Sequence, residues 1–217
     1  MSSRQGYPRR TVLKWVTGAA GILVSGSMLP NFGISAALAA DLGEGDIGIL
    51  NYAYALEQLE AAFYTKVTDH PFKGVTQGET EAFTEIRDHE RAHVDFFKKA
   101  LGEHAIPVIE VDFPKVDFDR RSSVLGTADV FENLGVAAFN GAGPLLVNAD
   151  YLAAAGTIVS VEARHAAMIS ALLHGPSSAS AGEGHVSSKG LDATMPPGKV
   201  LTQAKPFIKT PLTATFK

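Results

Sequence analysis

The motif Glu-x-x-His occurs twice in this chain, in "RDHERAHVDF" (87–96) and in "VEARHAAMIS" (161–170). Both copies lie where apolar residues recur every three or four positions, which is the pattern of a helix with one buried face. A glutamate and a histidine three positions apart point to the same side of a helix. Burying such groups is unfavourable unless something pairs with them, so each motif predicts a partner inside a helical core.

Four segments have a helical apolar stripe, and the two motifs lie in the second and the fourth. Their expected ranges are about 46–66, 80–101, 122–140 and 148–173. Gly102 and Gly175 are expected to end the second and fourth helices, because glycine commonly follows a helix C-terminus. Either Ser122 or Ser123 is expected to cap the third helix. The glycines that follow Glu132 favour a bend or break in that helix.

The connections between these segments are short, long and short. The long one, 102–121, contains Pro107 and Pro114 and is too long for a tight turn between neighbouring helices. This connectivity predicts an all-α fold, a ferritin-like four-helix bundle with one long crossover between helices two and three. We assign the bundle to residues 40–175 and a linker and C-terminal tail to 176–217. Within the tail, 196–208 is expected to be either a short helix on the bundle or an unstructured segment.

Each of the four stripes carries an acidic residue near its middle. Di-iron and di-manganese bundles use one glutamate from each of two helices and Glu-x-x-His from each of the other two. Four carboxylates and two neutral imidazoles also balance the charge of two divalent cations. The sequence therefore predicts a carboxylate-bridged centre of two iron ions, or two manganese ions. Its six expected ligands are Glu57, Glu90, His93, Glu132, Glu162 and His165.

The roles of these residues follow from their positions. We expect Glu57 and Glu132 to bind one ion each, and Glu90 and Glu162 to bridge the two ions. His93 is expected to bind one ion and His165 the other. These six ligands suit both iron and manganese, so they leave the choice of metal open.

Three further residues lie close in the sequence to the expected ligands. Glu60 lies one turn beyond Glu57 and is either an alternative ligand or a partner of the ligands, but Glu57 lies better on the apolar stripe. His89 is adjacent to Glu90, so it is expected to face away from the site and to be exposed. Tyr64 is expected to pack in the core, near the site.

The segments "ILNYAYALEQLEAAFY", "DHERAHVDFF", "FENLGVAAFNGAGPLL" and "VEARHAA" resemble the exported bacterial ferritin-like domain family, whose domain plant desiccation-related proteins share. The resemblance covers about residues 45–175 and implies a four-helix bundle related to ferritins, bacterioferritins and rubrerythrins. In bacterioferritins and rubrerythrins the ligand of the first helix stands seven residues before a tyrosine. Glu57 stands seven residues before Tyr64, so the resemblance favours Glu57 over Glu60.

The first 39 residues have the composition of an export signal. A basic start is followed by an uncharged run from Trp15 to Ala40 that ends in "AALAA". The segment "PRRTVLK" (8–14) resembles the twin-arginine export motif, although Pro8 and Val12 depart from it. Cleavage after Ala39 is expected, because glycines and a proline make the run a poor membrane helix. A retained anchor helix is the alternative.

Composition restricts the partners. Removal of residues 1–39 takes away four of the 19 basic residues and none of the 23 acidic ones, which leaves a net charge of −8. Such a chain is not expected to bind nucleic acid. The chain has no cysteine, so any metal must be held by carboxylate and imidazole.

Together these features predict an exported protein of the periplasm or cell envelope, anchored to the membrane if the signal is retained. Its expected partners are metal ions, oxygen or peroxide as a substrate, and the twin-arginine export machinery, with a homo-oligomer or a membrane-anchored assembly also open. The expected chemistry is ferroxidase-like or catalase-like. The alternative is a non-enzymatic envelope, stress-related or assembly protein on the same scaffold, with a structural metal or none.

Overall fold

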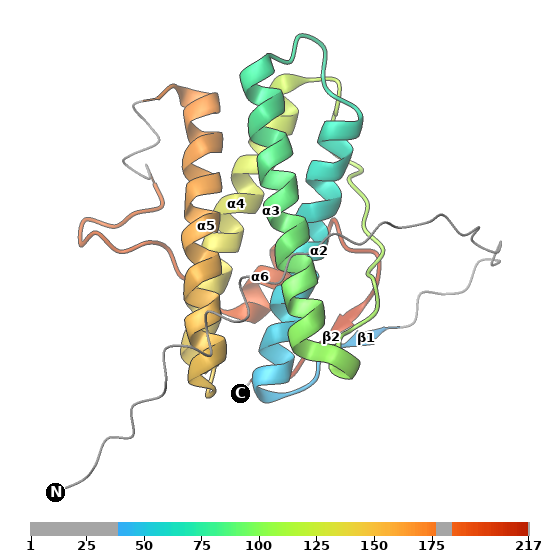
Figure 1. Ribbon diagram of the computed structural model, residues 1–217, viewed down its shortest axis with the longest axis vertical. Coiled ribbons are helices and arrows are strands. Elements are labelled where there is room, and N and C mark those ends of the chain that lie inside the picture. The colour runs from blue at the N-terminus through green and yellow to red at the C-terminus, as the bar shows by residue number, and fades with distance from the viewer. Residues whose placement is uncertain (1–38, 177–183, 217) are drawn as a thin grey trace, which may run out of the picture. The chain divides into compact units, whose positions relative to one another are not determined.

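The computed structural model describes residues 39–176 and 184–216. Four long helices lie alongside one another in it: α2 (Gly45–Asp69), α3 (Gln77–Leu101), α4 (Arg121–Ala142) and α5 (Ala149–His174) (Figure 1). Helix α2 packs mainly against α3, and α4 mainly against α5, so the bundle consists of two helical hairpins. This confirms the predicted all-α bundle.

The crossover between α3 and α4 is the long connection that the sequence predicts. It begins with a 3-10 turn, η1 (Gly102–His104), and runs beside the bundle to the start of α4 (Figure 1). A second 3-10 turn, η2 (Gly143–Leu145), belongs to the short connection from α4 to α5. Both hairpins therefore close through short loops, and only the crossover spans the bundle.

Aromatic side chains attach the crossover to the bundle. Phe113 and Phe118 of the crossover lie with ring centroids 5.9 Å apart, and Phe113 lies 5.6 Å from Phe63 of α2. Phe131 of α4 packs edge-on against Phe63 at 5.1 Å and against Phe207 of the C-terminal tail at 4.9 Å. Edge-on aromatic pairs at such distances contribute beyond the area they bury. One aromatic cluster thus joins both hairpins, the crossover and the tail.

Helices α3 and α5 have well-formed ends. The Thr76 hydroxyl accepts a hydrogen bond from the Glu79 N–H, and the Glu79 carboxylate accepts one from the Thr76 N–H, which makes a capping box. The Asn148 side chain caps α5. As the sequence predicts, Gly102 and Gly175 follow the last residues of these two helices, and both have positive φ.

The start of α4 differs from the prediction. The helix begins at Arg121, without a side-chain cap from Ser122 or Ser123. The Ser123 hydroxyl instead accepts a hydrogen bond from the Asp117 N–H, and the Arg121 guanidinium donates to the Glu79 carboxylate at 2.6 Å. The expected break is absent, because α4 is one continuous helix. Contacts with neighbouring helices stabilise a glycine-rich segment that intrinsic propensity alone disfavours.

The C-terminal tail packs on the bundle. Of the two alternatives for 196–208, the short helix is present as α6 (Pro197–Ala204), which contacts α4. The Met195 N–H donates to the Ala137 carbonyl of α4 at 2.9 Å. A Cβ at Gly141 would lie 2.0 Å from the Met195 carbonyl oxygen, so this contact requires glycine in α4.

A short parallel pair of strands closes the fold and was not predicted. Strand β1 (Ala40–Asp41) pairs with β2 (Leu212–Thr213), which places the two ends of the described chain side by side (Figure 1). Among the helices that the structure describes, none has both the length and the apolar character needed to cross a bilayer. The predicted signal at 1–39 lies, except for its last residue, outside the described residues.

Candidate metal centre

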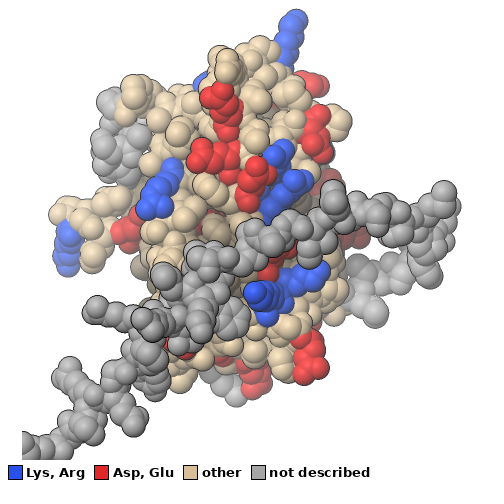
Figure 2. All heavy atoms as spheres, viewed as in Figure 1, with Lys and Arg blue, Asp and Glu red and all other residues tan. Residues whose placement is uncertain are grey.

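The structure brings all six predicted ligands together in the middle of the bundle. Helical geometry places Glu90 beside His93 on α3, and Glu162 beside His165 on α5, because residues three apart share a face. The two remaining ligands come from α2 and α4. The four glutamates, Glu57, Glu90, Glu132 and Glu162, are 0% exposed. None of them therefore contributes to the acidic side chains seen on the surface in Figure 2.

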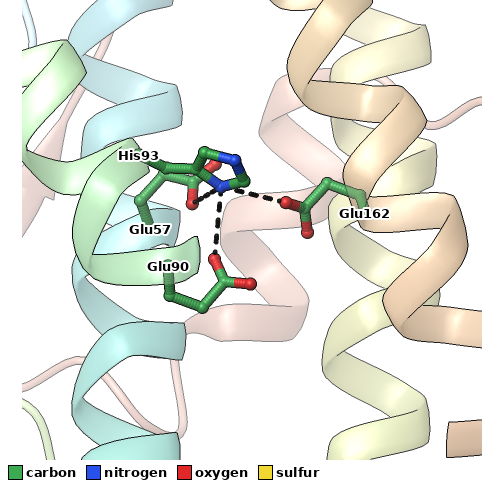
Figure 3. Close-up of side chains that lie close together, drawn as sticks. All are labelled: Glu57, Glu90, His93 and Glu162. Carbon is green, nitrogen blue, oxygen red and sulfur yellow. Dashed lines mark hydrogen bonds and ion pairs between the residues drawn. The ribbon is translucent and has the colours of Figure 1, made fainter. Parts of the chain in front are cut away.

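One imidazole nitrogen faces three carboxylates from three helices (Figure 3). The Nδ1 atom of His93 lies 3.1 Å from Glu57 Oε2, 3.2 Å from Glu162 Oε1 and 3.5 Å from Glu90 Oε2. Only the contact with Glu57 also has the geometry of a hydrogen bond. A single ring nitrogen has at most one proton to donate, so it cannot satisfy three carboxylates.

The second histidine has a similar environment. The Nδ1 atom of His165 lies 2.8 Å from Glu90 Oε1 and 3.4 Å from Glu132 Oε2. These distances suit ion pairs, yet the angles are not those of hydrogen bonds, and Nδ1 has no hydrogen-bond partner among the described residues. The nitrogen and the oxygens are therefore close without bonding to one another directly.

The ligand atoms form two groups of four. Glu57 and His93 belong to the first group and Glu132 and His165 to the second, while Glu90 and Glu162 belong to both. Within each group all four atoms lie within 4.8 Å of one another. Donors bound at about 2.0–2.2 Å to one ion are at most about 4.4 Å apart. Small adjustments of the side chains would thus bring each group onto one ion.

Many polar atoms of this cluster are buried without a hydrogen-bond partner among the described residues. They are Glu57 Oε1, Glu132 Oε2, His165 Nδ1 and both carboxylate oxygens of Glu90 and Glu162. An unsatisfied buried polar atom costs about 1–3 kcal/mol, and more when it is charged. A set of this size fits a site that is completed by cations, since carboxylate and imidazole suit iron and manganese.

Burial and mutual repulsion perturb the carboxyl groups. Burial, followed by repulsion from Glu162, raises the pKa of Glu57, and burial and repulsion from Glu90 raise that of Glu162. Burial raises the pKa of Glu132 to about 8 despite the opposing effect of a nearby histidine. Burial alone would also raise the pKa of Glu90, but the close approach of His165 and His93 outweighs burial and lowers this pKa to about 2.

The two histidines show the complementary effect. Burial would lower the pKa of His93, but Glu57 and the other carboxylates outweigh it and raise this pKa. The carboxylates of Glu132 and Glu90 likewise overcome burial and raise the pKa of His165 to about 10. Protons thus neutralise the cluster in the metal-free protein, in the place that cations would take.

Tyr64 is part of the site as well as of the core. Its side chain is fully buried, and its hydroxyl donates a hydrogen bond to Glu132 Oε1. Burial and the negative charge of Glu132 raise the pKa of this phenol, so it remains a donor at neutral pH. This bond orients one predicted ligand of α4 from the opposite hairpin.

The prediction for His89 was wrong. Its ring is half-buried and stacks on His165, with the planes 11° apart and the centroids 5.2 Å apart. Its Nδ1 lies 3.0 Å from His165 Nε2. Burial and proximity to His165 lower the pKa of His89, which favours a neutral ring that accepts the Nε2–H of His165. Ligand histidines commonly donate their second N–H in this way, which fixes their tautomer.

The two glutamates of α2 lie differently with respect to the cluster. Glu57 lies in the first group of ligand atoms, whereas Glu60 belongs to neither group. Glu60 is nevertheless buried, with 4% of its surface exposed. Glu60 therefore lies beside the two groups of ligand atoms but outside both of them.

Comparison with known proteins supports the fold. The family model described as ferritin-like domain matches residues 45–175, which include all four long helices. No curated protein matches the sequence. The match covers every predicted ligand and leaves the C-terminal tail outside it.

Proposed function

The chain belongs to the ferritin-like domain family, and from that premise we propose that it binds two iron or manganese ions and acts as an oxidoreductase on oxygen or peroxide. One observation carries the proposal: Glu90 and Glu162 lie in both groups of ligand atoms. Two carboxylates shared by two groups are the arrangement that bridges a pair of ions.

The side chains of this centre have distinct tasks. Glu57 and Glu132 would each bind one ion, Glu90 and Glu162 could bind both, and one histidine would bind each ion. When bound, a pair of such ions supplies one-electron chemistry and Lewis acidity to oxygen or peroxide.

The protein environment prepares these ligands. Tyr64 holds Glu132 through Oε1, and His89 holds His165 through Nε2. The full burial of the four ligand glutamates keeps bulk water away from the site, which strengthens their interaction with cations. Until an ion binds, the carboxyl group of Glu132, with its pKa near 8, retains a proton at neutral pH.

Metal analysis and oxygen consumption test the proposal in sequence. The purified mature protein is expected to contain, or to take up, about two iron or manganese ions per chain, one for each group of ligand atoms. With ferrous iron the loaded protein should consume oxygen, or with manganese it should decompose peroxide. Absence of metal would overturn the proposal, whereas two bound ions without either activity would support the non-enzymatic alternative.

We also propose that the chain is exported and that cleavage follows Ala39. In support, Ala40 is buried and is the first residue of β1, and its N–H donates to the Pro211 carbonyl at 2.8 Å. Ala39 is exposed. Mass analysis of the mature protein should find Ala40 at the amino terminus, and a protein that retains Met1 would favour the anchored form.

A further inference from the structure

Glu60 is a buried carboxylate that the six-ligand centre does not use. It lies one turn after Glu57 on α2 and is 4% exposed. Among the described residues, no hydrogen bond or ion pair to its carboxylate is found. Its environment contains the carboxylates of Glu162, Glu90, Glu132 and Glu57, which together with burial raise its pKa. A buried carboxyl group among like charges is neutralised either by its own proton or by a cation that displaces this proton.

The opposite helix leaves space for this carboxylate. A Cβ at Gly135 of α4 would lie 3.2 Å from Glu60 Oε1 and 3.2 Å from Glu162 Oε2. Contacts this short are tighter than most Cβ contacts, so only glycine accommodates both carboxylates without displacement. Glu60 therefore faces the same side of the centre as Glu162, one of the two shared carboxylates. Glycine within a helix costs about 1 kcal/mol of stability relative to alanine. The need for space beside the two carboxylates explains why α4 nevertheless has glycine at position 135.

Glu60 changes the charge of the centre. The six-ligand set contributes four negative charges, which two divalent ions neutralise. When bound ions displace the proton of Glu60, there are five charged carboxylates, and their five charges equal those of one divalent and one trivalent ion. In a dry interior an unmatched charge is unfavourable, so the fifth carboxylate favours the higher oxidation state. Net charge is one of the factors that set the reduction potential of a buried metal centre.

We propose that Glu60 is a fifth carboxylate of the metal centre, which Gly135 accommodates and which shifts the centre towards the trivalent state of iron or manganese. This inference rests on the proposed function, because it requires a pair of redox-active ions at the six ligands. It adds a residue that determines how readily these ions are oxidised.

The isosteric substitution Glu60→Gln tests this role by removing the charge. With iron bound, spectroelectrochemical titration should show a potential of the ferric/ferrous couple at least 59 mV higher than in wild type. That shift corresponds to a tenfold change in the ratio of ferric to ferrous affinity. Redox-inert Zn²⁺ should still bind at two ions per chain. Glu103→Gln, which removes an exposed charge beyond the end of α3, is the matched control and should leave the potential unchanged.

Gly135→Ala supplies a second test that does not alter any charge. Its Cβ should displace Glu60 and Glu162 and weaken the binding of Zn²⁺ about tenfold, within the range seen when groups next to metal ligands are changed. Gly126→Ala in the same helix is the control, because nothing lies within 4 Å of a Cβ at that position. This control should bind Zn²⁺ as wild type does.

The outcomes separate this inference from the proposed function. If the wild-type protein binds no metal, both the proposed function and the role of Glu60 are wrong. Two bound ions with an unchanged potential in Glu60→Gln, or equal Zn²⁺ affinities in Gly135→Ala and Gly126→Ala, would overturn the role of Glu60 alone. A third metal ion that binds wild type but not Glu60→Gln would also overturn it, because the fifth charge would then serve another cation.

Discussion

Hairpin α2–α3 has Glu60 and Tyr64 three and seven positions after the predicted ligand of α2. Hairpin α4–α5 has Gly135 and Phe139 at the same spacings after the predicted ligand of α4. The first hairpin thus supplies a carboxylate and a phenol at the positions where the second supplies a glycine and an apolar ring. The two halves of the bundle present the same ligand pattern but differ in the groups around it.

The residues that precede the two Glu-x-x-His motifs also differ, with a polar residue in the first hairpin and an apolar residue in the second. His89 precedes the motif of α3, whereas Val161 precedes that of α5. His89 contacts His165, and Tyr64 donates to Glu132, so both polar partners from the first hairpin act on ligands of the second. The half-site of Glu132 and His165 is therefore the better oriented one, and we expect the first ion to bind there.

Removal of a shared carboxylate should have the largest effect, because it damages both half-sites. Glu90→Gln is expected to lower the affinity for both ions by at least about a hundredfold, more than the tenfold to hundredfold typical of groups behind the ligands. Glu57→Gln and Glu132→Gln should each lose one ion and keep the other. Titration calorimetry with Zn²⁺ measures both affinities.

The control for Glu90→Gln is Glu85→Gln, which removes a charge from the exposed face of α3. It should retain two ions. If Glu90→Gln also binds two ions with wild-type affinity, Glu90 is not shared and the two half-sites are independent.

The second largest effect on metal affinity is expected from a change of pH. Ions compete with protons at ligands whose pKa is raised, to about 8 for Glu132 and about 10 for His165. Affinity should therefore rise with pH and level off only above these values. For each proton displaced, the increase is about tenfold per pH unit, or about a hundredfold from pH 6 to pH 8. Zn²⁺ calorimetry in buffers of different ionisation enthalpy measures the affinity and the released protons, and a flat profile would contradict the raised pKa values.

The substitution His89→Val makes the two motifs alike, because Val161 occupies the matching position in α5. It leaves His165 Nε2 without its acceptor. The affinity for one ion should therefore fall about tenfold, while the affinity for the other ion is unchanged. Val161→Ala is the control and should affect neither ion. If His89→Val lowers the affinity for both ions equally, the difference between the two half-sites does not come from this contact.

The smallest effect is expected for the phenol. Tyr64→Phe removes the donor to Glu132 Oε1 and should lower the free energy of unfolding of the metal-free protein by about 1–3 kcal/mol. Denaturation with urea at pH 7 measures this difference. Tyr54→Phe, on the same helix, should change it by less than about 0.5 kcal/mol. Equal values for the two variants would mean that the hydrogen bond contributes no net stability.

The sequence predicted the helices and the pairing within each Glu-x-x-His motif, because both depend on local spacing. It misjudged His89, since a position adjacent to Glu90 is rotated away from the apolar stripe of α3. That rotated face is the one that packs beside α5, where His165 lies seventy-six residues further along the chain. It also left the place of Glu60 open, because the space opposite Gly135 exists only between packed helices.

By itself, the sequence determined which residues share a helix face, since a repeat of 3.6 residues per turn follows from the covalent chain and its backbone hydrogen bonds. Only the tertiary structure decided how those faces meet: the contact of His89 with His165, the bond from Tyr64 to Glu132 and the pairing of β1 with β2. Such contacts depend on the rotation and offset of packed elements, which side-chain packing over the whole core sets.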